Sequence, residues 1–133
     1  LGVEAKTKIG PAENEAVEVS LESEDSGILI GRYGQTLDAL ELILNLLVAK
    51  KLGEWTPIYL NVGDWRQKRE EALQEMAKRT VEKVKVTGQP ATLPYLTPKE
   101  RRIVHLFLHD HPEVTSSSFG EDEGRRVIIQ LRA

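Results

Sequence analysis

Apolar and polar residues alternate at strand spacing in two early segments and one later segment. Residues 3–9 alternate loosely, and residues 16–21 alternate more cleanly. A turn at Gly10-Pro11 and a polar loop would join these two strands. Residues 56–62 alternate again. The pattern therefore predicts three strands, the third well separated in sequence from the other two.

The segment between the second and third strands changes to helical spacing. A short apolar run at 27–30 ends at Gly31, and a longer helical pattern starts at Gln35 and ends before Gly53. The longer helix carries an apolar stripe that we assign to the core: Leu37, Leu40, Ile43, Leu44, Leu47 and Val48. Two helices separated by a glycine-containing loop are therefore expected here.

Capping signals mark the starts of three helices. The acidic run ending at Asp25 predicts a solvated turn, in which Ser23 or Asp25 caps the helix that follows. Asp64 precedes a long helical pattern with a highly charged exposed face. Thr97 and Glu100 form a capping box, which defines the start of a last helix. The chain thus gains two helices after its third strand.

The C-terminal segment predicts a closing hairpin. Residues 114–119 and 125–131 alternate around an acidic, glycine-containing turn. Arg126 and Ile128 would share one face of the second strand, and Arg125 the other, so that one arginine lies beside the last helix. We take Arg126 as the candidate.

The loop at 31–34 has the chemistry of a phosphate site. Gly31 and Gly34 allow a sharp turn and leave no side chain between the backbone and a ligand. The N–H groups from Gln35 onward open a helix, where the dipole favours anions. Arg32 adds a full charge, and Tyr33 offers a ring for stacking on a base. A Gly-x-x-Gly loop between two helices is the backbone clamp of a KH module, which binds single-stranded nucleic acid.

A second candidate site lies on the last helix. Arg101 and His105 are four residues apart and share one face, and His109 continues the line. A guanidinium and an imidazole on one face can bond a phosphate and stack on a base. The spacing is that of the R-x-x-x-H domain, a small fold that binds single-stranded nucleic acid. The alternative is that His105 is structural, bonded to a neighbouring acceptor.

Composition and charge limit the possible functions. The absence of cysteine excludes a disulfide framework, a thiolate zinc site and a cysteine nucleophile. Residues 1–63 carry five Lys and Arg against ten Asp and Glu, net −5, whereas residues 64–133 carry thirteen against eleven, net +2. No apolar run is long enough for membrane insertion. Because the sequence opens at Leu1, we expect a piece of a longer protein.

The KH loop and the R-x-x-x-H helix together resemble the bacterial Jag family, also called SpoIIIJ-associated or KhpB proteins. The resemblance is carried by GRYGQTLDAL and YLTPKERRIVHLFLHDHPEV. It implies an α+β fold, with a type II KH domain (a three-stranded sheet with packed helices) at 1–63 and a small α/β R-x-x-x-H domain at 64–133. It also implies a cytoplasmic, non-catalytic RNA chaperone or post-transcriptional regulator linked to cell elongation and division. Nothing in the chain matches the family's N-terminal Jag domain.

The resemblance also implies ligands and partners. Gly31, Arg32, Tyr33 and Gly34 would grip single-stranded RNA, and Arg101 with His105 would contact a second stretch. Whether DNA is accepted stays open. Neither a cofactor nor a metal is expected, and the expected protein partner is a small KH-domain protein or a second copy.

Two other classes of function remain as alternatives. The acidic first half, with its apolar helix, could be a protein-interaction or dimerisation module whose nucleic-acid site is degenerate. An enzyme acting through His105 and His109 is the third class, although no pairing of a nucleophile with a base stands out. Loss of RNA binding on changing Gly34 to Asp would favour the first hypothesis over the dimerisation module.

Overall fold

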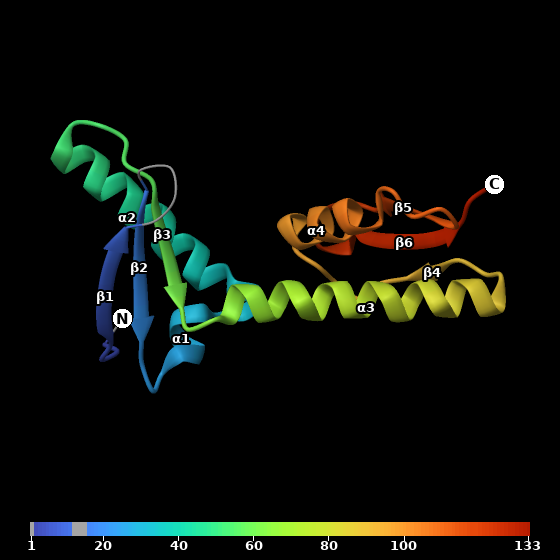
Figure 1. Cartoon of the computed structure of the whole chain (residues 1–133), viewed down its shortest axis with the longest axis horizontal. Helices are drawn as coiled ribbons and strands as arrows, with labels where there is room; N and C mark the ends of the chain where they lie inside the picture. Colours follow the sequence, from blue (N-terminus) through green and yellow to red (C-terminus); the bar gives the residue numbers. More distant parts are fainter. Residues whose placement is uncertain (1, 12–15) are drawn as a thin grey trace. The chain divides into compact units, whose positions relative to one another are not determined.

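The computed structural model describes residues 2–11 and 16–133, which form two compact units, Leu1–Arg66 and Gln67–Ala133 (Figure 1). In the described part of the chain, no helix has the length and apolar character needed to span a membrane.

The first unit is a three-stranded sheet with helices packed on it. Its strands are β1 (Lys6–Pro11), β2 (Val17–Glu22) and β3 (Ile58–Val62), in the order β1-β2-β3. β1 runs antiparallel to β2, and β2 runs parallel to β3. The connection from β2 to β3 contains α1 (Ser26–Ile30), the 3-10 turn η2 (Arg32–Gly34) and α2 (Gln35–Leu52) (Figure 1). A parallel pair with an added antiparallel N-terminal strand agrees with the expected type II KH arrangement.

Alternation along β2 and β3 builds the core of this unit. The register pairs Val19 with Leu60 and Leu21 with Val62, so alternate residues of both strands point to the helical side. They pack against Leu29 of α1 and other apolar residues in a single buried cluster: Val19, Leu29, Leu37, Ile58, Leu60 and Val62. The sheet thereby fixes both helices that flank the loop.

Two local predictions for this unit are wrong. Gly10 and Pro11 belong to β1 and do not form a turn, because the end of an edge strand tolerates a residue without an N–H. The predicted polar loop after them falls on residues 12–15, outside the described part of the chain. No side chain caps α1: the Ser23 hydroxyl instead accepts from the N–H of Asp25 and donates to the carbonyl of Glu4.

The apolar stripe predicted on α2 is confirmed only in part. Leu37 is fully buried, and Leu40, Leu44 and Val48 pack against the core. The outward side of the helix is also apolar, with four side chains more than half exposed: Leu42, Ile43, Leu46 and Leu47. Because apolar residues lie on both sides of α2, spacing alone could not tell the inner side from the outer one.

The second unit packs two helices on an antiparallel sheet. α3 (Trp65–Thr87) contributes residues from Gln67 onward, and α4 (Pro98–Leu108) follows. The strands β4 (Ala91–Thr92), β5 (Val114–Phe119) and β6 (Arg126–Leu131) pair in the order β4-β6-β5, and the 3-10 turn η3 (Asp122–Gly124) joins the hairpin (Figure 1). The predicted hairpin is confirmed.

Both helices of this unit cover the same face of the sheet. Val127 and Ile129 of β6 share one buried cluster with residues of α3 and α4. The predicted capping box starts α4: the Thr97 side chain accepts from the N–H of Glu100, and the Glu100 side chain accepts from the N–H of Thr97. The α+β class predicted from the sequence is confirmed.

Candidate nucleic-acid interface

The loop between α1 and α2 is built from left-handed backbone. Gly31, Tyr33 and Gly34 have φ of 71°, 55° and 75°. A side chain is rarely tolerated there, so Tyr33 is held in an uncommon conformation by its surroundings. A Cβ on Gly31 would lie 2.1 Å from the Thr36 hydroxyl oxygen. The first glycine is therefore required by the helix start that follows it.

The second glycine has a role that the sequence did not indicate. Gly34 is buried, and a Cβ there would lie 2.4 Å from the ring of Trp65. The missing side chain makes room for Trp65, which packs against the core of the first unit. Gly34 thus serves the packing of this unit, whereas the sequence alone suggested an open approach for a ligand.

The charged and polar groups of the loop face solvent. Arg32 is exposed, and its guanidinium lies 5.3 Å from the centre of the Tyr33 ring. Gln35 opens α2 and is exposed, and no side chain caps the N-terminus of that helix. An exposed arginine therefore lies next to a helix start whose first N–H groups have no side-chain acceptor.

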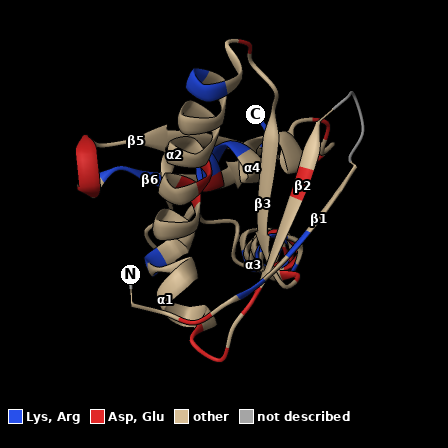
Figure 2. Ribbon diagram, turned by 90° about the vertical axis from the view of Figure 1, so that its left-hand side faces the viewer, with Lys and Arg blue, Asp and Glu red and all other residues tan. Residues whose placement is uncertain are grey.

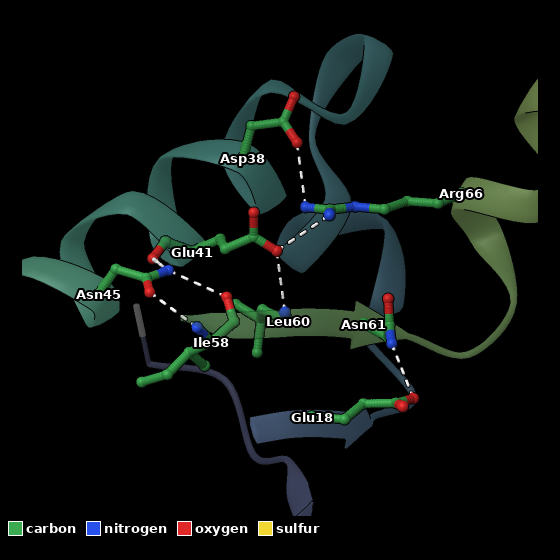
Figure 3. A network of polar contacts seen from close by, with 8 residues as sticks. All are labelled: Glu18, Asp38, Glu41, Asn45, Ile58, Leu60, Asn61 and Arg66. Atoms are coloured by element: carbon green, nitrogen blue, oxygen red, sulfur yellow. Dashed lines mark hydrogen bonds and ion pairs between the residues drawn. The ribbon is translucent and has the colours of Figure 1, made fainter. Parts of the chain in front are cut away.

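Arg66 holds the carboxylates of the first turns of α2 (Figure 3). Its NH2 lies 3.0 Å from an oxygen of Asp38, and its NH1 lies 2.9 Å from an oxygen of Glu41. Asp38 lies four residues after Gly34, so its charge would oppose a phosphate at the loop. The arginine offsets the negative field that these two carboxylates would otherwise create there.

Side chains of α2 also bond the outer edge of β3 (Figure 3). The Asn45 amide donates to the Ile58 carbonyl at 3.0 Å and accepts the Ile58 N–H at 2.8 Å. Glu41 accepts the Leu60 N–H at 2.9 Å. These bonds take the place of a neighbouring strand and fix α2 along the sheet edge.

In the second unit, His105 is held between two serines of β5. Its Nδ1 lies 2.7 Å from the Ser116 hydroxyl, and its Nε2 lies 2.7 Å from the Ser118 hydroxyl. A neutral ring meets both, donating through one nitrogen and accepting through the other. Arg101 donates to the Leu96 carbonyl at 2.9 Å. His105 therefore joins α4 to the sheet, as in the structural interpretation that the sequence left open.

The arginine beside His105 is Arg125. Burial lowers the pKa of His105 below its ordinary value of 6.5, and the charges of Arg101 and Arg125 lower it further. Arg126 is paired in register with Phe119, whereas Ser118 is paired with Val127, so Arg126 lies on the opposite face of the sheet. The placement of Arg126 beside α4 is wrong, because strand alternation gives that side to Arg125.

We expect stability to rise with pH as His105 loses its proton. The unfolded ring titrates near 6.5, whereas the folded ring has a lowered pKa, so the unfolded chain binds more protons between these values. The urea midpoint should therefore fall as the pH drops below about 6.5. His105→Gln should flatten this dependence, and His109→Gln, at a side chain that is 78% exposed, should not. Equal pH profiles for both variants would contradict this role of His105.

The other histidines are separate from this site. His109 lies 3.9 Å from a carboxylate oxygen of Asp110, and His111 accepts the N–H of Glu113. Within residues 2–11 and 16–133, no three His, Asp or Glu side chains gather in a way that could hold a metal.

Sequence reasoning missed four of the residues that shape these two sites: Trp65, Arg66, Ser116 and Ser118. Serines two apart in a strand that pairs back toward a histidine-bearing helix are a weak signal for the latter two. Trp65 and Arg66 gave no signal, since their partners lie far away in the sequence.

A type II KH unit, followed by a unit with an arginine and a histidine one turn apart on a helix, defines a tandem KH and R-x-x-x-H protein. Residues 2–57 match the family description of the KhpA/KhpB KH domain, and residues 71–131 match the R-x-x-x-H domain. The chain belongs to the KhpB family.

Curated relatives agree with this assignment. "RNA-binding protein KhpB" of Clostridium symbiosum is 36% identical over 132 residues, which cover 99% of this chain and 59% of the relative. The protein of the same name from Bacillus subtilis (strain 168) is 30% identical over 115 residues, covering 85% of this chain and 55% of the relative. That of Lactiplantibacillus plantarum is 28% identical over 119 residues, covering 90% and 37%. The chain therefore spans only part of the length of these relatives.

Proposed function

We propose that this chain is a non-catalytic module that binds single-stranded RNA through two sites, one in a KH domain at 1–63 and one in an R-x-x-x-H domain at 64–133. The relatives named above are RNA-binding proteins. The observation that carries the proposal is the exposed Arg32 beside the uncapped start of α2, with the nearby carboxylates already held by Arg66. The proposal places the chain in the cytoplasm, as an RNA chaperone or regulator linked to cell elongation and division.

In the first site, the loop grips the sugar-phosphate backbone. Arg32 supplies charge, and the first N–H groups of α2, starting at Gln35, supply donors. Tyr33 lies beneath the Arg32 guanidinium, which orients the charge toward solvent. Gly31 and Gly34 act indirectly, by allowing the backbone that presents these groups.

In the second site, Arg101 and Arg125 supply the charges around His105. Because both ring nitrogens of His105 are bonded to serine hydroxyls, the ring positions Ser116 and Ser118. Phosphate contacts therefore fall to the two arginines and to these hydroxyls. Two modest sites on one chain combine through effective concentration.

We expect RNA binding to weaken with salt and to weaken further when single arginines of the two sites are replaced. The test is the binding of a short labelled single-stranded RNA across a salt series, with Arg32→Ala, Arg101→Gln and Arg125→Gln. Each glutamine keeps a donor for the carbonyl that the arginine bonds. Each variant should bind a few-fold less tightly, and the salt slope should fall by about 0.7 for every phosphate that the variant no longer neutralises.

The matched control is Arg79→Gln, which removes an arginine whose side chain is 79% exposed on α3. Equal binding by the wild type and all four variants would overturn the proposal, and so would a wild type that does not bind. Unlabelled single-stranded DNA of the same sequence, used as a competitor, tests whether the module prefers RNA.

The outward side of α2 favours a second role, the binding of a protein partner. Leu42, Ile43, Leu46 and Leu47 are 53 to 60% exposed and lie on the side of α2 opposite its buried residues. In Figure 2, the ribbon of α2 is largely without charge, with Lys and Arg near its upper end. The alternative function is therefore a dimerisation module, with a second copy or a small KH-domain protein on this face.

We expect the chain to self-associate through this face at high concentration. Light scattering over a concentration series should give a rising mass for the wild type, and a constant monomer mass for Leu46→Glu. Lys50→Glu, at an exposed position next to the apolar face, is the control for the added charge. A wild type that stays monomeric would exclude the second copy and leave the RNA sites unaffected.

A further inference from the structure

The sheet of the second unit has one face that its helices do not cover. The buried residues of β6, Val127 and Ile129, point toward α3 and α4. The residues that alternate with them point the other way, and the register aligns them with partners on β5 and β4: Thr92, Thr115, Ser117, Phe119, Arg126, Ile128 and Gln130. All of these are exposed or half-buried.

An aromatic and cationic group lies at one end of this face. Phe119 is 47% exposed, although it is a large apolar side chain. It is paired in register with Arg126, whose guanidinium lies 5.3 Å from the centre of the Tyr95 ring. The NH1 of Arg126 donates to the carbonyl of Arg125 at 3.1 Å and also to that of Glu123. The charge and the two rings are thereby held in place before any ligand arrives.

The charges of this face suit an anion. The strand positions on it carry one arginine and no carboxylate, in a chain with a net charge of −3. The carboxylates nearest in sequence belong to the acidic turn around η3, just before the two arginines (Figure 2). A bound strand would therefore extend from Phe119 and Arg126 across the sheet toward Thr92 and Gln130, away from that turn.

We propose that this open face is a third RNA-binding surface, on which the bases of a single strand stack. Phe119 and the Arg126–Tyr95 pair are the stacking groups, and the hydroxyls of Thr115 and Ser117 contact the strand. Aromatic side chains on an open sheet bind bases in this way because every base offers a flat face. The surface rests on the proposed function but lies on the side of the sheet opposite His105.

The test uses the full chain and a labelled single-stranded RNA of about 15 nucleotides, long enough to reach several groups on the chain. Phe119→Ser should weaken binding about tenfold without changing the salt slope, because stacking carries no charge. Arg126→Gln should weaken binding and lower the slope by about 0.7. Urea unfolding of both variants should match the wild type, since Phe119 is about half exposed.

Two matched controls remove equivalent groups elsewhere. Val86→Ser removes an apolar side chain on α3 that is 84% exposed, and Arg79→Gln removes an exposed charge. Both should bind as the wild type does. If Arg32→Ala and Arg125→Gln weaken binding while Phe119→Ser does not, this third surface is excluded and the proposed function stands. If the wild type does not bind the RNA, both are excluded.

Discussion

Replacement of Glu100 by alanine is expected to lower the free energy of unfolding of the second unit by about 3 kcal/mol. Glu100 is 5% exposed, and one carboxylate oxygen accepts from the Nε of Arg69 while the other accepts the N–H of Thr97. Alanine would remove the capping box and leave Arg69, 27% exposed, without this carboxylate. Urea unfolding, followed by far-UV circular dichroism, measures the loss.

The contrast is a glutamate–arginine pair on the surface. Glu75 lies 3.5 Å from Arg79, and the side chains are 56% and 79% exposed. Glu75→Ala should change the stability by less than about 0.5 kcal/mol. Glu100→Gln keeps an acceptor for Thr97 and should lie between the two alanine variants. Similar losses for Glu100→Ala and Glu75→Ala would show that burial of Glu100 does not matter.

The substitution Gly34→Asp is expected to destabilise the first unit by about 3 kcal/mol, beyond any effect on RNA. A side chain at φ 75° is strained, and its Cβ would collide with the Trp65 ring. The fluorescence of Trp65 and the urea midpoint should both change. Loss of RNA binding in this variant would therefore report a damaged fold, so it cannot distinguish an RNA-binding loop from a degenerate one.

The variant that makes this distinction is Arg32→Asp. Arg32 is exposed and precedes the left-handed residues, so aspartate there places a negative charge at the loop without a collision. The urea midpoint should stay within error of the wild type, while RNA binding falls more than in Arg32→Ala. An unchanged urea midpoint for Gly34→Asp would contradict the packing role of Gly34.

Much of the fold could be predicted because its signals are local. The capping box of Thr97 and Glu100 is set by residues three apart, and the end of α2 at Gly53 by one glycine. The alternation of 56–62 predicted β3 for the same reason. The turn at Gly10-Pro11 failed because pairing with β2, a contact outside the local window, extends the strand.

The candidate sites were harder to predict because distant residues shape them. The loop glycines were found from sequence, but the reason for Gly34 lies in Trp65, thirty-one positions later. Arg66 bonds residues of α2 that no spacing rule connects to it. Choosing between Arg125 and Arg126 required the strand register, which two residues of adjacent sequence do not contain.

The bonds from Asn45 and Glu41 to β3 also affect how this unit behaves among many copies of itself. An unpaired strand edge is a template on which another chain can add, which is how aggregation often begins. On β3, the Ile58 and Leu60 amides are already taken. Edge-to-edge growth through this sheet is thereby directed to β1, where Lys6 and Lys8 are exposed and the like charges of approaching copies repel.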